Sequence, residues 1–205
     1  MLDAALIQQC ADPSLKPAIV EQFVTAAGAN DPLAVTVKSD DRLILVPKAT
    51  SADQAIAIVR QYVGQAVVRV GLTQFPAGVG VKDAADLKPD LIDPCQNLRN
   101  GTAMFAKILR IVAKWYGNPK SDDVFPQIFE DAVYAWKTGE FEGVSVFQAE
   151  DPGGAIANQK EPRADNSKTD SVDVGAPLRT EVEPSGEMKI RTAGIRVDLS
   201  RISGN

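Results

Sequence analysis

The sequence is organised around one short stretch, Val70-Gly71-Leu72-Thr73-Gln74-Phe75-Pro76. In this stretch Gln74, a long polar amide, stands among apolar residues and turn formers. A buried amide needs partners for its two N–H donors and for its carbonyl acceptor. Gln74 is therefore predicted to be either a core residue with internal hydrogen bonds or a group that faces a ligand. The first interpretation is favoured on this stretch alone, because buried polar side chains usually bond internally.

The composition restricts the chemistry that this chain can perform. The chain has 205 residues, a formal net charge of −5, 44% hydrophobic residues and 24% charged residues, which is typical of a soluble globular protein. The acidic balance gives no electrostatic footprint for binding nucleic acid, so no direct nucleic-acid partner is expected. With no histidine, the chain lacks Ser-His-Asp and Cys-His machinery, and two cysteines cannot form a four-thiolate zinc site. We expect no cofactor and no metal, and any chemistry would depend on carboxylates.

The sequence carries no visible membrane or export signal. No apolar run is long enough to span a bilayer, so no transmembrane segment is expected. The first nine residues lack the basic start and apolar core of a secretory signal. On these residues alone, a cytoplasmic location is the expectation.

The first part of the chain predicts a helix followed by a hairpin. Asp12-Pro13 is typical of an N-cap with proline at the first helical position, and an apolar stripe with a four-residue spacing then runs as far as Gly28. Residues 33–37 and 43–46 are apolar runs separated by a polar turn, which predicts a short β-hairpin.

Three more helices are predicted after the hairpin. The second main helix opens at Ser51, and its apolar face is expected to extend as far as Val67. The third begins at Asp93-Pro94 and stops at Gly117, and the fourth is ended by Gly139. Together with the hairpin, these helices predict an α+β fold that is mainly α.

The composition shifts near Gln148. The segment 151–205 is rich in Gly, Pro, Asp, Ser and Lys and has no aromatic residue. It cannot bury enough apolar surface to offset the entropy cost of ordering. We therefore predict a domain over residues 1–148 and a mostly disordered tail over residues 149–205. Alternating residues at 188–190 and 195–199 could pair as strands with a partner, although a solvated tail is the favoured interpretation.

Four motifs occur in the order seen in one enzyme family. Residues 71–74 are similar to a Gly-Leu-Gly-Gln-Ile motif, and residues 93–98 to an Asp-Pro-x-x-Asn-Leu motif that opens a helix. Residues 134–139 are similar to Tyr-Asn-x-Gly, and residues 30–35 to Asn-Pro-Leu-Ala-Ile with one residue inserted. In this order and with a matching hairpin, the chain resembles the lytic transglycosylases of type IV secretion systems. The resemblance implies a lysozyme-like domain and glycan strands of peptidoglycan as a binding partner.

The whole chain is also similar to a family of conjugal transfer proteins encoded by tumour-inducing and related rhizobial plasmids. This similarity implies a role in conjugation, within a mating apparatus of the type IV secretion kind. Other proteins of the conjugation apparatus are then the expected partners.

The resemblance raises the question of whether a catalytic acid is present. In lytic transglycosylases one Glu protonates the glycosidic oxygen, and the 6-hydroxyl of the sugar closes an anhydro ring. Such an acid needs an apolar cleft that raises its pKa, and in this family it ends the first main helix. Here that position falls on Phe23 or on Ala27-Gly28, depending on the register. Glu21 lies about 200° around the helix from Phe23, so it is predicted to be a surface carboxylate and is only a weak candidate acid.

We therefore predict a transglycosylase scaffold that has lost its acid. The alternative is an active lytic transglycosylase with a displaced acid, Glu21 or Glu140, which would open the cell wall for the transfer channel. The resemblance also implies a substrate cleft formed by Gln74, Phe75, Tyr134, Trp136 and Thr138. The Tyr-Asn pair of the family reads Trp136-Lys137 here, which is a second departure from its pattern.

In the resembled family, cysteines at the positions of Cys10 and Cys95 can pair. Such a disulfide would stabilise the fold by roughly 3–5 kcal/mol in the chain-entropy model, and it would imply a periplasmic location. The alternative is a pair of free thiols in a reducing cytoplasm, which the N-terminal residues favour.

Overall fold

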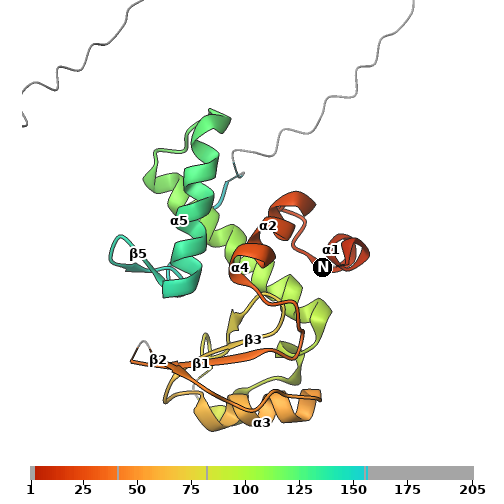
Figure 1. Ribbon diagram of the computed structural model, residues 1–205. Helices are drawn as coiled ribbons and strands as arrows, with labels where there is room; N and C mark the ends of the chain where they lie inside the picture. Colours follow the sequence, from red (N-terminus) through yellow and green to blue (C-terminus); the bar gives the residue numbers. More distant parts are fainter. Residues whose placement is uncertain (1–2, 41, 82, 155, 157–205) are drawn as a thin grey trace, which may run out of the picture. The chain divides into compact units, whose positions relative to one another are not determined.

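The computed structural model describes residues 3–40, 42–81, 83–154 and 156 (Figure 1). The longer helices are α1 (Ala4–Cys10), α2 (Pro17–Ala27), α3 (Ala52–Tyr62), α4 (Pro94–Trp115) and α5 (Phe125–Thr138). Three short 3-10 turns are η1 (Ala84–Asp86), η2 (Pro89–Leu91) and η3 (Asp122–Val124). The strands are β1 (Val35–Ser39), β2 (Arg42–Ile44), β3 (Val67–Val70), β4 (Phe75–Pro76), β5 (Glu140–Phe141) and β6 (Val144–Ser145). The predicted α+β class, with more helix than strand, is confirmed. The tail segments 188–190 and 195–199 lie outside the described residues.

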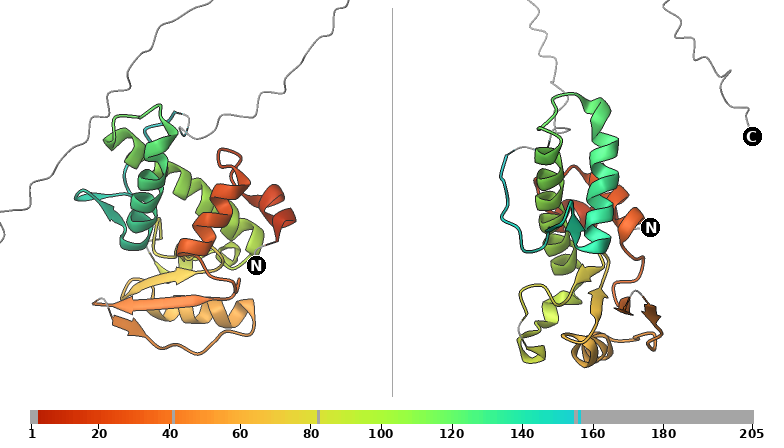
Figure 2. Two further views of the ribbon diagram at one scale, coloured as in Figure 1. Left: turned by 45° about the horizontal axis from the view of Figure 1, so that its top comes forward. Right: turned by 90° about the vertical axis from the view of Figure 1, so that its left-hand side faces the viewer.

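The main sheet is antiparallel and has the strand order β2-β1-β3-β4. The predicted hairpin is its β1–β2 pair, in which Val37 lies opposite Ile44. On the other side of β1, Val35 lies opposite Val70 of β3, which in turn pairs with Phe75 of β4. Helix α3 packs against β1 and β3, whereas α4 packs against α1 and α5 (Figures 1 and 2).

The N-terminal part differs from the prediction. Instead of one helix from Asp12-Pro13, the chain forms α1 and then a separate α2, whose first residue is Pro17. The side chain of Asp12 accepts a hydrogen bond from the backbone N–H of Ser14 at 2.8 Å, so it caps a turn rather than a helix. Asp and Asn stabilise turns through this same contact, which explains why the start signal was misplaced.

The second main helix begins where predicted but ends early. The Ser51 side chain accepts from the backbone N–H of Gln54, which is the expected N-cap contact. The helix stops at Tyr62, and Gly64 then turns the chain with φ +83°. Val67 therefore lies in β3 rather than on the helix, as suits a run of β-branched residues.

The other two helix signals are accurate. The Asp93 side chain accepts from the N–H of Gln96 at 2.8 Å and caps α4, with Pro94 at the first helical position. Gly139 ends α5 in the left-handed conformation, with φ +86°. In both cases the signal lies within a few residues of the helix end that it sets.

The core is centred on a cluster of aromatic rings from α2, α4 and α5. Phe23 stacks on Phe105 with ring centroids 3.9 Å apart, and it meets the ring of Trp136 edge-on at 5.1 Å. All three side chains are fully buried. No helix in the described part of the chain is long and apolar enough to cross a membrane.

Candidate functional site

The stretch after β3 forms a tight turn against α4. Gly71 has φ +72° and Gln74 has φ +51°. A Cβ atom on Gly71 would overlap the side chain of Asn97, so only glycine fits there. Gly101 of α4 is equally crowded, because a Cβ on it would overlap the side chain of Thr73. Two glycines thus allow the turn and the helix to approach each other closely.

Asn97 holds this turn with all of its side-chain hydrogen-bonding groups. Its Nδ2 donates to the carbonyls of Val70 at 3.0 Å and Leu91 at 2.9 Å. Its Oδ1 accepts from both the backbone N–H and the hydroxyl of Thr73, each at 3.0 Å. Asn97 is only 1% exposed. We call this set of contacts the Asn97 clamp, and its role is structural because no donor is left for a ligand.

Gln74 and its neighbours also face the interior. The Nε2 of Gln74 donates to the carbonyl of Gly71 at 3.1 Å, and the residue is 8% exposed. The indole N–H of Trp136 donates to the carbonyl of Thr73 at 3.1 Å. Phe75 is buried, with its ring centroid 6.3 Å from that of Trp136. These contacts match the interpretation of Gln74 as a residue bonded within the fold.

A buried arginine connects this turn to the end of α5. The Nη1 of Arg69 donates to the carbonyl of Gln74 at 3.2 Å, and its Nη2 donates to the carbonyls of Trp136 at 2.6 Å and Lys137 at 3.0 Å. The last carbonyls of a helix lack partners within the helix and carry partial negative charge, so they suit a cation. Burial lowers the pKa of Arg69 to about 10, so it stays protonated at neutral pH.

The surroundings of Arg69 were not predicted from the sequence. Its guanidinium lies 5.9 Å from the ring of Trp136 and 5.7 Å from that of Phe147, within range of cation–π attraction. The available signal was a charged residue inside the β-branched run Val67-Val68-Arg69-Val70. A buried charge requires partners, but two of the three carbonyls that Arg69 reaches lie 67 and 68 residues further along the chain.

An open groove of about 620 Å³ lies beside Arg69. Its walls come from the β1–β2 turn, the chain between α3 and η1, and the chain from the end of α5 to Phe147. Arg69 is the buried charge in this lining, whereas Lys38, Asp40, Asp83 and Glu140 are exposed. We call these three acids the rim acids.

The structure does not gather the five expected cleft residues around this groove. Thr138 lines it, and its hydroxyl bonds to the backbone of Tyr134 and Glu140. Tyr134 is 64% exposed and, like the buried Gln74, Phe75 and Trp136, is not part of the groove lining.

Neither of the two positions at which the motifs predict a catalytic acid holds one. Phe23 lies in the aromatic core, and Gly28 packs on the backbone of Leu72. Glu21 is exposed on α2 and does not line the groove. Among the described residues no Asp or Glu is buried. Nor do three or more His, Cys, Asp or Glu side chains of these residues come together in a way that could hold a metal ion.

The two cysteines form a disulfide in the structure. It joins the last residue of α1, Cys10, to the second residue of α4, Cys95, with 5.1 Å between their Cα atoms. The sequence separation of 85 residues makes this a long covalent loop.

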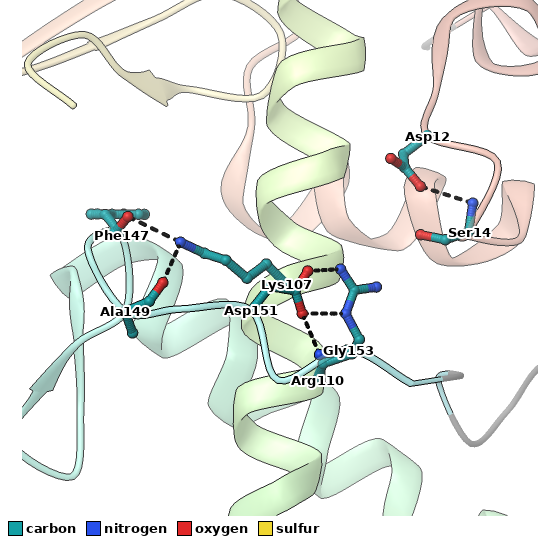
Figure 3. Close-up of polar contacts among 8 residues, drawn as sticks. All are labelled: Asp12, Ser14, Lys107, Arg110, Phe147, Ala149, Asp151 and Gly153. Carbon is teal, nitrogen blue, oxygen red and sulfur yellow. Dashed lines mark hydrogen bonds and ion pairs between the residues drawn. The ribbon is translucent and has the colours of Figure 1, made fainter. Parts of the chain in front are cut away.

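The chain after β6 crosses α4, and we call residues 146–153 the strap. Figure 3 shows the Nζ of Lys107 donating to the carbonyls of Phe147 and Ala149, each at 3.0 Å. Partial burial lowers the pKa of Lys107. Val146 is fully buried. The strap therefore fixes the position of Phe147, which walls the groove.

An ion pair holds the far end of the strap (Figure 3). Arg110 donates from Nε to Asp151 at 2.8 Å and from Nη2 to the other oxygen of the same carboxylate. The backbone N–H of Gly153 donates to Asp151 at 2.9 Å. The hydrogen bond from Arg110 is the main reason that the pKa of Asp151 is held below its ordinary value. This two-pronged geometry is the strong form of an arginine–carboxylate contact.

The protein has an α+β fold in which the buried hydrogen bonds of Asn97, Gln74 and Arg69 hold the structure together. Its groove is open and has polar lining residues. The chain matches the TraH_2 family model over residues 1–204, and it belongs to this family of TraH-type conjugal transfer proteins. It is 70% identical over 204 residues to the uncharacterized protein y4dP of Sinorhizobium fredii (strain NBRC 101917 / NGR234), with all of both chains covered. No solved structure matches the chain.

Proposed function

We propose that this protein acts in plasmid conjugal transfer as a non-catalytic component of the mating apparatus. Its domain is built on a scaffold like that of the lytic transglycosylases and lacks their acid. The family supports the role in conjugal transfer, and the order of the motifs supports the scaffold. One observation supports the loss of activity. Phe23, one of the two positions at which the motifs place the catalytic Glu, packs against Phe105 and Trp136.

The chemistry explains why this observation matters. A single-acid mechanism needs a carboxylic acid that keeps its proton near neutral pH, which apolar surroundings provide. The aromatic core offers such surroundings, but it holds phenylalanine, and no Asp or Glu of the described residues is buried. The carboxylates that line the groove are exposed.

The proposal includes binding to peptidoglycan glycan strands in the periplasm. The groove offers polar side chains and the ring of Phe147, which is a surface that suits sugars. The disulfide between Cys10 and Cys95 supports an oxidising compartment. Free thiols in protein trapped from cells would instead place it in the cytoplasm. Other proteins of the conjugation apparatus are the proposed partners.

Digestion of purified sacculi tests the loss of activity. The full-length, oxidised protein is incubated with sacculi, and the products are scored by mass spectrometry for anhydro-muropeptides. We expect no anhydro products, together with co-sedimentation of the protein with the sacculi. Absence of sedimentation would remove glycan binding and leave a purely structural role.

A second candidate function is a transglycosylase with a displaced acid. Glu140 favours it, because this carboxylate lines the groove next to Thr138. The variants Glu140→Gln and Glu21→Gln separate the two functions. Anhydro products that disappear only in Glu140→Gln would establish this second function and overturn the first, and Glu21→Gln serves as the control for an exposed Glu outside the groove.

A further inference from the structure

Arg69 has an unusual combination of burial and incomplete pairing. It is 8% exposed, and its hydrogen bonds reach three backbone carbonyls but no carboxylate. Lys48–Asp31 and Arg110–Asp151 are ion pairs of the described residues, and Arg69 belongs to neither. An ion that is removed from water without a counter-ion is costly, and an anion beside it would offset that cost.

The Nε–H group of Arg69 has no hydrogen-bond acceptor among the described residues. The hydrogen bonds of this side chain use Nη1 and Nη2. Yet no side-chain nitrogen or oxygen of these residues is fully enclosed without a partner. The Nε atom is therefore not fully enclosed, and Arg69 is one of the residues that line the groove.

The other charged side chains that line the groove favour one kind of anion over another. The rim acids Asp40, Asp83 and Glu140 line the groove, and Lys38 is the other cation among the described residues that line it. Three exposed negative charges disfavour a multiply charged anion such as phosphate. They favour a ligand that carries a positive group beside its negative one. The ring of Phe147 adds an apolar wall, and a volume of about 620 Å³ suits a ligand of a few residues.

We propose that this groove binds a short zwitterionic peptide whose free carboxylate meets Arg69 and whose ammonium group lies near the rim acids. The helix-end carbonyls hold the guanidinium in place before binding, so little side-chain ordering remains to be done. The strap sets the position of Phe147 through Lys107 and thereby completes the wall. This binding does not depend on the absence of transglycosylase activity.

The test uses two versions of one probe and the full-length, oxidised protein. The dipeptide lysyl-alanine is titrated into ¹⁵N-labelled protein, in parallel with the same dipeptide carrying a C-terminal amide. We expect shifts at the groove glycines Gly64, Gly78 and Gly139. Because a hydrogen bond to a charged group is lost, the amide should bind roughly 10- to 100-fold more weakly. Equal binding of the two probes, or no shifts with either, would overturn the proposal.

Two further comparisons locate the binding. In the variant Glu140→Gln the dipeptide should bind severalfold more weakly, whereas the dipeptide acetylated on both its α- and ε-amino groups should be unaffected. In Arg69→Lys the preference for the free carboxylate over the amide should shrink, and Arg60→Lys, an exposed arginine outside the groove, should leave it intact. If Arg69→Lys does not fold, the probe pair still decides. Tighter binding of inorganic phosphate than of the dipeptide would overturn the selection by the rim acids.

Discussion

Replacing Asn97 by alanine should destabilise the protein far more than a neighbouring substitution of the same kind. The change removes the four hydrogen bonds of the Asn97 clamp. It leaves the backbone N–H of Thr73 and the carbonyl of Leu91 without these partners. Each buried group without a partner lowers the free energy of unfolding by about 1–3 kcal/mol. The better helix propensity of alanine offsets at most about 0.7 kcal/mol of this loss. We expect a loss of roughly 3–5 kcal/mol in the free energy of unfolding.

Asn100→Ala is the matched control. Asn100 lies on the same helix, is exposed, and has the same propensity difference from alanine. We expect it to be neutral or slightly stabilising. Urea unfolding of the oxidised protein, followed by far-UV circular dichroism and by tryptophan fluorescence, to which the buried Trp136 and the exposed Trp115 both contribute, measures both variants.

The isosteric variant Asn97→Asp separates hydrogen bonding from cavity formation. It keeps the volume and the acceptor for Thr73 but loses the two donated hydrogen bonds and introduces a buried charge. It should therefore also destabilise strongly at neutral pH. If Asn97→Ala and Asn100→Ala differ by less than about 1 kcal/mol, the clamp is not the structural centre that we describe.

Three further outcomes follow from other contacts. Reduction of the Cys10–Cys95 disulfide should lower the free energy of unfolding by roughly 4–5 kcal/mol, on the chain-entropy estimate for a loop of this length; the double Cys→Ser variant should not respond to reductant. The pKa of Asp151 is lowered in the folded protein. Its contribution to the free energy of unfolding is therefore present above about pH 4 and is lost as the pH falls through the folded pKa. The melting temperature should therefore fall less between pH 5 and pH 3 in Asp151→Asn than in the unsubstituted protein. An equal fall in both proteins would refute this role. Gly101→Ala should lower the free energy of unfolding by about 1–3 kcal/mol, because its Cβ would overlap Thr73. A higher free energy of unfolding in urea would contradict this crowding.

The helix ends that could be predicted are those set by local contacts. Asp93 and Gly139 act on residues no more than four positions away, so the sequence pattern was sufficient. Strand β3 was missed because Val63 and Val67 also match a helical spacing. Nothing in that spacing shows that the chain turns at Gly64 and pairs with β1.

The site was less predictable because its contacts are long-range. The motif residue Asn97 was found, but its bond to Thr73 spans 24 residues and shows only in the fold. Arg69 meets the end of α5 across 67 residues. The sequence therefore indicated which polar residues were unusual, whereas their hydrogen bonds to α4 and α5 depend on how the fold brings distant segments together.

The links from the turn to α4 and α5 have a consequence for how the molecule opens. Thr73 bonds to Asn97 of α4, and its carbonyl accepts from Trp136 of α5. Full release of the turn requires both connections to break, so we expect it to open together with both helices rather than alone. Amide hydrogens such as that of Thr73 should then exchange with solvent at the slow rate set by global unfolding. The sheet and the two long helices would behave as a single cooperative unit, despite their separation along the chain.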